Sequence, residues 1–160
     1  MLSRVADSCF WLSRYLERAE SNARILDVNV QLVLDLEALN APDANLHWGP
    51  ILDTLEDRER FDELYGAIGG DAVMEFVTFE KSNANSILAC VSLARENART
   101  VREQISSEMW EALNRLYLHL HGPSARASHR ESPIGFYRSL VDSLHAFQGI
   151  TDATMTHGEG

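Results

Sequence analysis

Two stretches of the chain repeat arginine and glutamate at helical spacing, and these side chains are the candidates for chemistry. Residues three or four positions apart lie on the same face of a helix, so each series predicts a charged flank with ion pairs inside one helix. Exposed pairs of this kind contribute about 0.2–0.5 kcal/mol each, and the simplest interpretation is a solvated surface. The first series is Arg14, Glu17, Arg18, Ser21 and Arg24, and the second is Arg95, Glu96, Arg99, Arg102 and Glu103.

A second interpretation gives these side chains a site. If the two helices pack together, Arg and Glu can form buried pairs between them, and such pairs fix the register of the helices. The planar guanidinium also binds carboxylate or phosphate through two parallel hydrogen bonds. All the Lys and Arg residues except Lys81 are arginines, so local binding of an anion fits the composition.

Motifs for other chemistry are missing from the sequence or occur in isolation. There is no Gly-x-Ser-x-Gly nucleophile motif, no phosphate loop and no dinucleotide fingerprint. Helical di-metal sites need two Glu-x-x-His motifs, whereas this chain has none and has a single Asp-x-x-His, from Asp142 to His145. We therefore predict no metal and no cofactor, and the sequence leaves open whether the protein is an enzyme.

The apolar pattern predicts the helices that position these side chains. Apolar residues alternate at steps of three and four from Val5 to Val33, with no Pro or Gly between residues 3 and 39, which predicts a spine helix over 3–39, roughly 50 Å long. The same spacing behind a capping Asn83 predicts a second long helix over 83–105. Shorter helices are expected at 50–60, 61–65, 71–79, 108–121 and 133–154, with a polar loop over 122–132. The predicted fold class is all-α, an irregular multi-helix bundle around the two long amphipathic helices.

Length, charge and cysteine content restrict the class of protein. A chain of 160 residues fits a single domain over residues 1–160. Its net charge of −10 repels nucleic acid and anionic membranes, so neither is an expected partner. No apolar stretch reaches the roughly 18 residues that a membrane span needs, and Cys9 and Cys90 have no disulfide or redox spacing. We expect two buried thiols and a cytoplasmic protein.

Two blocks of sequence resemble the alpha-E family of bacterial all-α proteins, named for a Glu-Arg pair. The first is MLSRVADSCFWLSRYLERAESNARILDV at residues 1–28, where the pair is Glu17-Arg18, and the second is NANSI at 83–87 with ARENARTVREQISSEMWE at 94–111. The resemblance spans nearly the whole chain. It implies a protein encoded beside a circularly permuted ATP-grasp ligase, and often a transglutaminase-like protein, in a peptide-modifying pathway. By the same resemblance the functional surface is Glu17, Arg18, Glu20, Asn22 and Arg24 in the first helix, with Asn83, Asn85, Arg95, Glu96, Asn97, Arg99, Arg102 and Glu103 in the second segment.

The resemblance also implies a longer protein and leaves three functions open. Members of the family are usually about twice this length, with a second Glu-Arg helix after a segment like residues 157–160. We therefore expect this chain to be the N-terminal half of a longer or duplicated protein. The missing half, or a second copy of the chain in a homodimer, would then complete it. The preferred function is an accessory component that binds the ligase or its peptide. A transferase or ligase subunit would hold a phosphorylated or carboxylate substrate against Arg18, Arg24 and Arg99. A structural dimerising domain would expose a large apolar patch.

Overall fold

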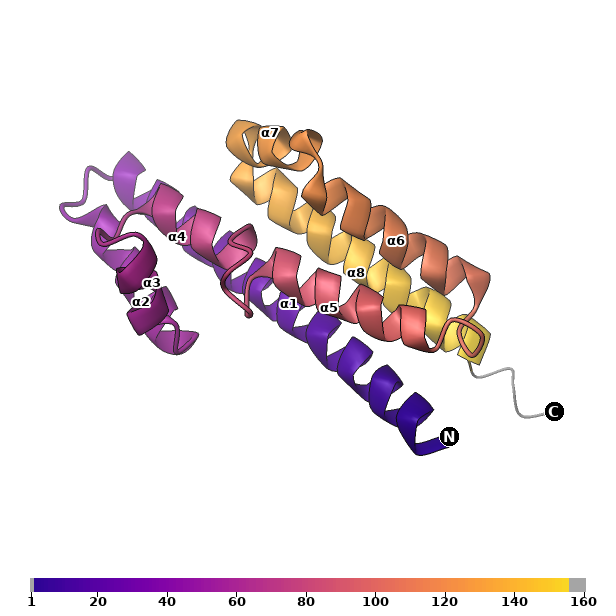
Figure 1. Cartoon of the computed structure of the whole chain (residues 1–160). Coiled ribbons are helices and arrows are strands. Elements are labelled where there is room, and N and C mark those ends of the chain that lie inside the picture. Colours follow the sequence, from indigo (N-terminus) through magenta and orange to yellow (C-terminus); the bar gives the residue numbers. More distant parts are fainter. Residues whose placement is uncertain (1, 156–160) are drawn as a thin grey trace.

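Helix α1 (Leu2–Ala38) is the spine of the structure (Figure 1). The computed structural model describes residues 2–155, so the segment at 157–160 lies outside the described part of the chain. The described residues form eight α-helices and one 3₁₀ helix without a strand, which confirms the all-α prediction. The predicted bounds of the first helix, 3–39, each differ by one residue from those observed.

The core lies where α5 (Ile87–Thr100) packs along α1. Ala19 and Ala23 of α1 and Ala94 and Ala98 of α5 are all fully buried. Small side chains on both helices let the helix axes approach closely, and larger residues such as Leu26 fill the space on either side. The three-four periodicity therefore identified the packing faces of both helices.

The second long helix is shorter than its periodicity predicted. Ser86 is its N-cap, because the Ser86 hydroxyl accepts a hydrogen bond from the Ala89 N–H at 3.1 Å, and Asn83 lies in the preceding turn. The helix ends at Thr100, although Val101 and Ile105 remain buried. The prediction of 83–105 was wrong at both ends, because the turns before and after the helix also bury residues at the same three-four spacing.

The segment between α1 and α5 folds into short elements at the C-terminal end of α1 (Figure 1). The predicted helix over 50–60 is interrupted at Glu56, whose φ of 57° lies in the left-handed region. The predicted helix at 61–65 is instead the end of the element that starts at Arg58. In order the elements are η1 (Ala44–Trp48), α2 (Gly49–Thr54), α3 (Arg58–Leu64) and α4 (Gly70–Thr78).

Three helices complete the bundle: α6 (Ser107–His121) packs on α5, α8 (Pro133–Met155) packs on α1, and α7 (Pro123–Glu131) joins them and packs on both. The expected polar loop over 122–132 is helical, and that prediction was wrong. Pro123 at the first turn favours a helix start, and Ala125 is fully buried. Arg126 binds Glu75 of α4 at 2.6 Å and lies over the Phe79 ring, so tertiary contacts hold a helix that has few apolar residues.

A buried chain of hydrogen bonds ties α4, α7 and α8 together. The Tyr137 hydroxyl lies 2.8 Å from Thr78 Oγ1 and 2.9 Å from His129 Nε2. Burial raises the pKa of Tyr137 and lowers the pKa of His129, so both side chains are neutral partners in this chain. The bonds satisfy the Thr78 and Tyr137 hydroxyls, which are fully buried and could not reach water.

Two expectations about the surface and the cysteines can also be compared with the structure. Within residues 2–155, none of the helices combines the length and apolar character needed to cross a membrane. Cys90 is buried as predicted, whereas Cys9 is half-buried at the edge of an apolar cavity. Burial raises the pKa of both thiols.

We predict that Tyr137→Phe lowers the free energy of unfolding by about 1–3 kcal/mol, because Thr78 and His129 would each lose a buried hydrogen-bond partner. Urea unfolding followed by circular dichroism would measure the change. Tyr15→Phe removes the same atom from a half-buried tyrosine of α1 and should cost less than about 0.5 kcal/mol. Equal costs for the two variants would show that the Tyr137 bonds contribute nothing to stability.

Candidate functional site

Five polar residues from three segments meet beside the middle of α1, and we call them the Arg18 cluster: Arg18, Asn22, Asp57, Asn83 and Asn85. Arg18 Nη1 donates to Asn85 Oδ1 at 3.2 Å, and Asn22 Nδ2 donates to the Asn85 carbonyl at 2.8 Å. Asn85 Nδ2 in turn donates to Asp57 Oδ1 at 3.2 Å. The cluster therefore joins α1 to the turn before α3 and to the loop between α4 and α5.

Local structure positions each member of the cluster. Arg18 and Asn22 are four residues apart on α1 and so point the same way. The Asn83 side chain accepts from the Asn85 N–H at 3.0 Å, which closes an Asx-type turn, and it donates to the Phe76 carbonyl of α4 at 3.1 Å. The loop that carries Asn85 is thereby attached to α4 before α5 begins.

Asp57 is the least satisfied member of the cluster. The residue is 8% exposed, and its Oδ2 atom is buried without a hydrogen-bond partner among residues 2–155. Burial raises the pKa of Asp57 above its ordinary value of 3.8, and the Asn85 hydrogen bond and the Arg18 charge offset part of that rise. The carboxylate therefore destabilises the fold unless another donor reaches it.

Four residues of the Arg18 cluster, all except Asn83, line a cavity of about 330 Å³. Ligand sites in proteins have volumes of roughly 300–1,000 Å³, so this cavity is large enough for a small group. Behind it, Cys90 is buried, and burial raises its thiol pKa to about 11 although the Arg18 charge acts against this rise. A thiol with that pKa is a poor nucleophile at neutral pH. The cavity-lining residues, which supply hydrogen-bond donors and acceptors, are Arg18, Asn22, Thr54, Leu55, Glu56, Asp57 and Asn85.

The other predicted residues of α1 lie outside this cavity. Glu17 is exposed and pairs with Arg14 at 3.3 Å. Glu20 accepts from Arg24 at 2.9 Å and lies 2.6 Å from His145 Nε2 of α8. Burial alone would raise the pKa of Glu20, but the hydrogen bonds from Arg24 and His145 outweigh it and lower the pKa. Glu17 and Glu20 also border a second cavity of about 330 Å³, whose other lining residues are mostly apolar.

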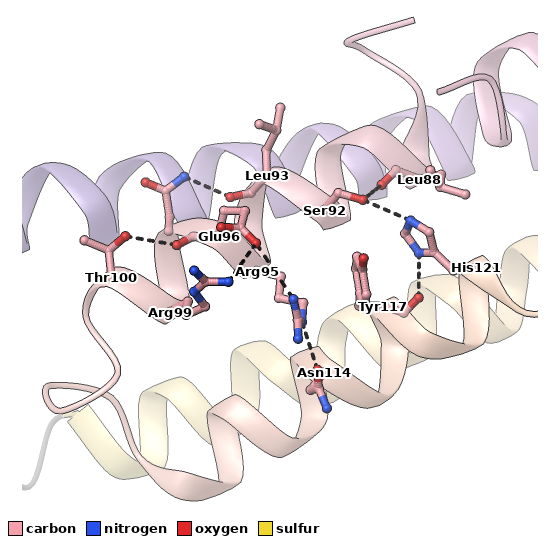
Figure 2. Close-up of polar contacts among 11 residues, drawn as sticks. Leu88, Ser92, Leu93, Arg95, Glu96, Arg99, Thr100, Asn114, Tyr117 and His121 are labelled. Atoms are coloured by element: carbon pink, nitrogen blue, oxygen red, sulfur yellow. Dashed lines mark hydrogen bonds and ion pairs between the residues drawn. The ribbon is translucent and has the colours of Figure 1, made fainter. Parts of the chain in front are cut away.

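The arginines of α5 face α6 and not α1 (Figure 2). Arg95 Nε donates to Asn114 Oδ1 at 2.8 Å, and its guanidinium lies over the rings of Tyr117 and Trp110 at 4.4 and 5.3 Å. Arg102 also lies over Trp110, at 5.6 Å. Within α5, Glu96 pairs with the exposed Arg99 at 3.9 Å, and Asn97 donates to the Leu93 carbonyl at 2.9 Å, while Glu103 beyond the helix end is exposed.

The interpretation of paired charges between the two long helices was wrong. Among the described residues, no ion pair joins α1 to α5; the α1 pairs are with α1 itself or with α8. The fully buried alanines at the α1–α5 contact explain this, because helices packed closely on small residues leave no room for long charged side chains. The simpler interpretation, ion pairs within one helix, describes Arg14–Glu17, Glu20–Arg24 and Glu96–Arg99.

The structure does not bring the predicted functional surface together. Arg18, Asn22, Asn83 and Asn85 meet in the Arg18 cluster, and Glu20 and Arg24 meet His145. Arg95 and Arg102 contact α6, whereas Glu17, Glu96, Asn97, Arg99 and Glu103 are exposed or bonded within their own helix. Arg18, Arg24 and Arg99 therefore do not share one pocket, as a catalytic arginine site would require. Sequence reasoning missed Asp57, because it follows a turn that no periodic signal marks, and it considered His145 solely as a metal ligand. Within the described residues no group of three or more His, Cys, Asp or Glu side chains could hold a metal ion.

Comparison with known proteins identifies a family for the whole chain. The family model named Alpha-E, described as a predicted alpha-helical domain with a conserved ER motif, matches residues 1–160. No curated protein and no solved structure matches the chain. The chain contains Glu-Arg at Glu17-Arg18 and at Glu59-Arg60, and the arginine of the first pair belongs to the Arg18 cluster.

We predict that the stability gained by Asp57→Asn relative to the native protein increases as the pH rises. The pKa of Asp57 is higher in the folded protein than its value of 3.8 in the unfolded chain. The native protein is therefore most stable at low pH, where Asp57 is protonated, and it loses stability as the pH rises through the folded-state pKa and the buried carboxylate ionises. Asparagine carries no charge and avoids this loss. Urea unfolding between acidic and neutral pH would measure the difference.

Asp62→Asn is the matched control for Asp57→Asn, because Asp62 is an exposed residue of the adjacent helix α3. It reports the general effect of removing one negative charge from an acidic protein. A stability difference for Asp57→Asn that stays constant with pH, or that decreases, would contradict the assignment of Asp57 as a desolvated acid.

We also predict that Arg95→Ala lowers the free energy of unfolding by about 1–3 kcal/mol, because it removes a hydrogen bond and two cation–π contacts between α5 and α6. Arg99→Ala removes the same side chain one turn later, where it is exposed, and should cost less than about 0.5 kcal/mol. Thermal and urea unfolding would compare the two. A larger loss of stability for Arg99→Ala would mean that the exposed ion pair with Glu96 contributes more to stability than the contacts of Arg95 with α6.

Proposed function

Because the chain belongs to the Alpha-E family, we propose that it is a helical binding component of a bacterial peptide-modifying system that works with an ATP-grasp-type amide ligase. An amide ligase joins a carboxylate to an amine, so at least one of its substrates carries polar groups that a partner protein can hold. In this proposal the chain holds such a group and presents it to the ligase. A transglutaminase-like protein would act in the same pathway.

The observation that carries this proposal is the placement of Arg18. Its guanidinium lines a cavity and is oriented by Asn85, so it is held in position before any ligand arrives. The other groups around the cavity are amides, a hydroxyl and carboxylates, which are suited to holding polar groups. Binding, with chemistry supplied by the ligase, is the role that these residues support best.

We predict that the chain increases the rate at which an ATP-grasp ligase encoded beside it forms amide bonds, and that Arg18→Gln reduces this increase by about tenfold or more. The measurement is a reconstituted reaction with purified ligase, its peptide and ATP, followed by product mass and ADP release. Arg14→Gln is the matched control, since Arg14 lies one turn earlier on α1 and pairs with Glu17 away from the cavity. Circular dichroism would establish that both variants are folded.

Two results would contradict the proposal. The first is a ligase that forms product equally well without this chain. The second is Arg18→Gln protein that stimulates the ligase as well as the native protein, which would remove the Arg18 cavity from the function.

A further inference from the structure

Arg18 has hydrogen-bonding capacity that the protein does not use. Its guanidinium donates to Asn85 Oδ1 and also interacts with the Cys90 thiol. These contacts use at most two of the five N–H donors of a guanidinium, and no other hydrogen bond to Arg18 is formed within residues 2–155. Because Arg18 lines the cavity, the unused donors can bind a carboxylate through parallel hydrogen bonds.

Asp57, in the same cavity, has an oxygen acceptor that lacks a hydrogen-bond donor within residues 2–155. It is more than nine-tenths buried, one carboxylate oxygen accepts from Asn85, and the other has no partner among the described residues. A buried carboxylate oxygen without a donor is destabilising, and a cationic N–H group is its strongest partner. The Asn85 amide lies between Asp57 and Arg18 and bonds to both, so the two charges are held apart by a side chain.

The charges around the cavity restrict the ligand. Arg18 contributes one positive charge, and Glu56 and Asp57 are carboxylic acids. A simple anion would be repelled by the carboxylates, and a simple cation would leave the unused donors of Arg18 without an acceptor. A group that carries both an ammonium and a carboxylate satisfies both sides at once.

We propose that the Arg18 cavity binds the zwitterionic head group of a free α-amino acid, with the ligand carboxylate on Arg18 and the ligand ammonium on Asp57. The proposal rests on the binding role described above and names the class of substrate. The cavity of about 330 Å³ is at the lower end of the range for ligand sites and accommodates a head group with a small part of a side chain. An amino acid held in this way would be a co-substrate of the amide ligase.

The geometry also specifies a signal of binding. Asp57 Oδ2 is buried and Asn85 Nδ2 donates to Oδ1 at 3.2 Å, so the ligand ammonium reaches the carboxylate only when the Asn85 side-chain amide moves away. The ammonium then replaces the Asn85 bond to Oδ1 and supplies the donor that Oδ2 lacks in the described part of the chain. Binding therefore changes the surroundings of the Asn85 side-chain amide and of the Arg18 guanidinium. Both groups carry N–H protons that nuclear magnetic resonance can follow.

The experiment is a titration of the full ¹⁵N-labelled chain with glycine and the common L-amino acids, and separately with acetate, methylammonium and acetamide. We expect at least one amino acid to shift the Asn85 amide and Arg18 Nε signals saturably, at concentrations about tenfold or more below those needed for the three single-function compounds. Arg18→Gln and Asp57→Asn should abolish this preference, and Arg14→Gln should keep it. Arg18→Lys keeps the charge without the planar fork and should weaken binding less than Arg18→Gln.

Several results would overturn the inference. Acetate, methylammonium or acetamide binding as tightly as every amino acid would show an anion, cation or amide site. Binding unchanged in folded Asp57→Asn protein, or no saturable shift with any amino acid, would also overturn it. The titration and the ligase assay can fail separately: an amino acid that binds without any effect on the ligase contradicts the proposed function alone, and a stimulated ligase without amino-acid binding contradicts this inference alone.

Discussion

Asn85 is the residue on which the candidate site depends, because all four of its hydrogen-bonding groups are used. Its carbonyl accepts from Asn22, its N–H donates to Asn83, its Oδ1 accepts from Arg18 and its Nδ2 donates to Asp57. An amide can serve a guanidinium and a carboxylate at the same time because it carries both an acceptor and a donor. Arg18 and Asp57 are thus bridged by a neutral group, and each retains hydrogen-bonding capacity that a direct ion pair would have used.

The position of Asn85 is in turn set by the packing of α1 on α5. Ser86 follows it and caps α5, and the Ser86 N–H donates to the Asn83 carbonyl at 3.0 Å, so the loop is fixed at the point where the helix begins. Alanines on both helices bring the α5 backbone close to α1, which lets a short side chain such as Asn22 reach the loop carbonyl. A helix with larger residues at these positions would place Asn85 too far from Arg18 for the same bonds.

The sequence predicted the parts of this arrangement that periodicity controls. Helix α1 could be predicted almost to the residue because no Pro or Gly interrupts its apolar seam. Two predictions of helices were wrong for opposite reasons. The helix predicted at 83–105 was too long because buried residues of the following turn continue the apolar spacing of α5. Helix α7 was predicted as a loop because its residues are mostly polar, and the contacts of Arg126 and Ala125 hold it in place. Within the cluster, Arg18 and Asn22 were predictable as helical neighbours, whereas Asp57 depends on the left-handed conformation of Glu56, which no propensity of glutamate suggests.

The Glu-Arg pair illustrates why adjacent residues of a helix must be considered one at a time. Successive side chains are about 100° apart around a helix with 3.6 residues per turn, so adjacent residues point in different directions. Arg18 faces the polar cavity, and Glu17 borders the apolar cavity between α1, α6 and α8. The rotation of α1 about its axis is therefore constrained from two sides, by Asn85 acting on Arg18 and by His145 acting on Glu20.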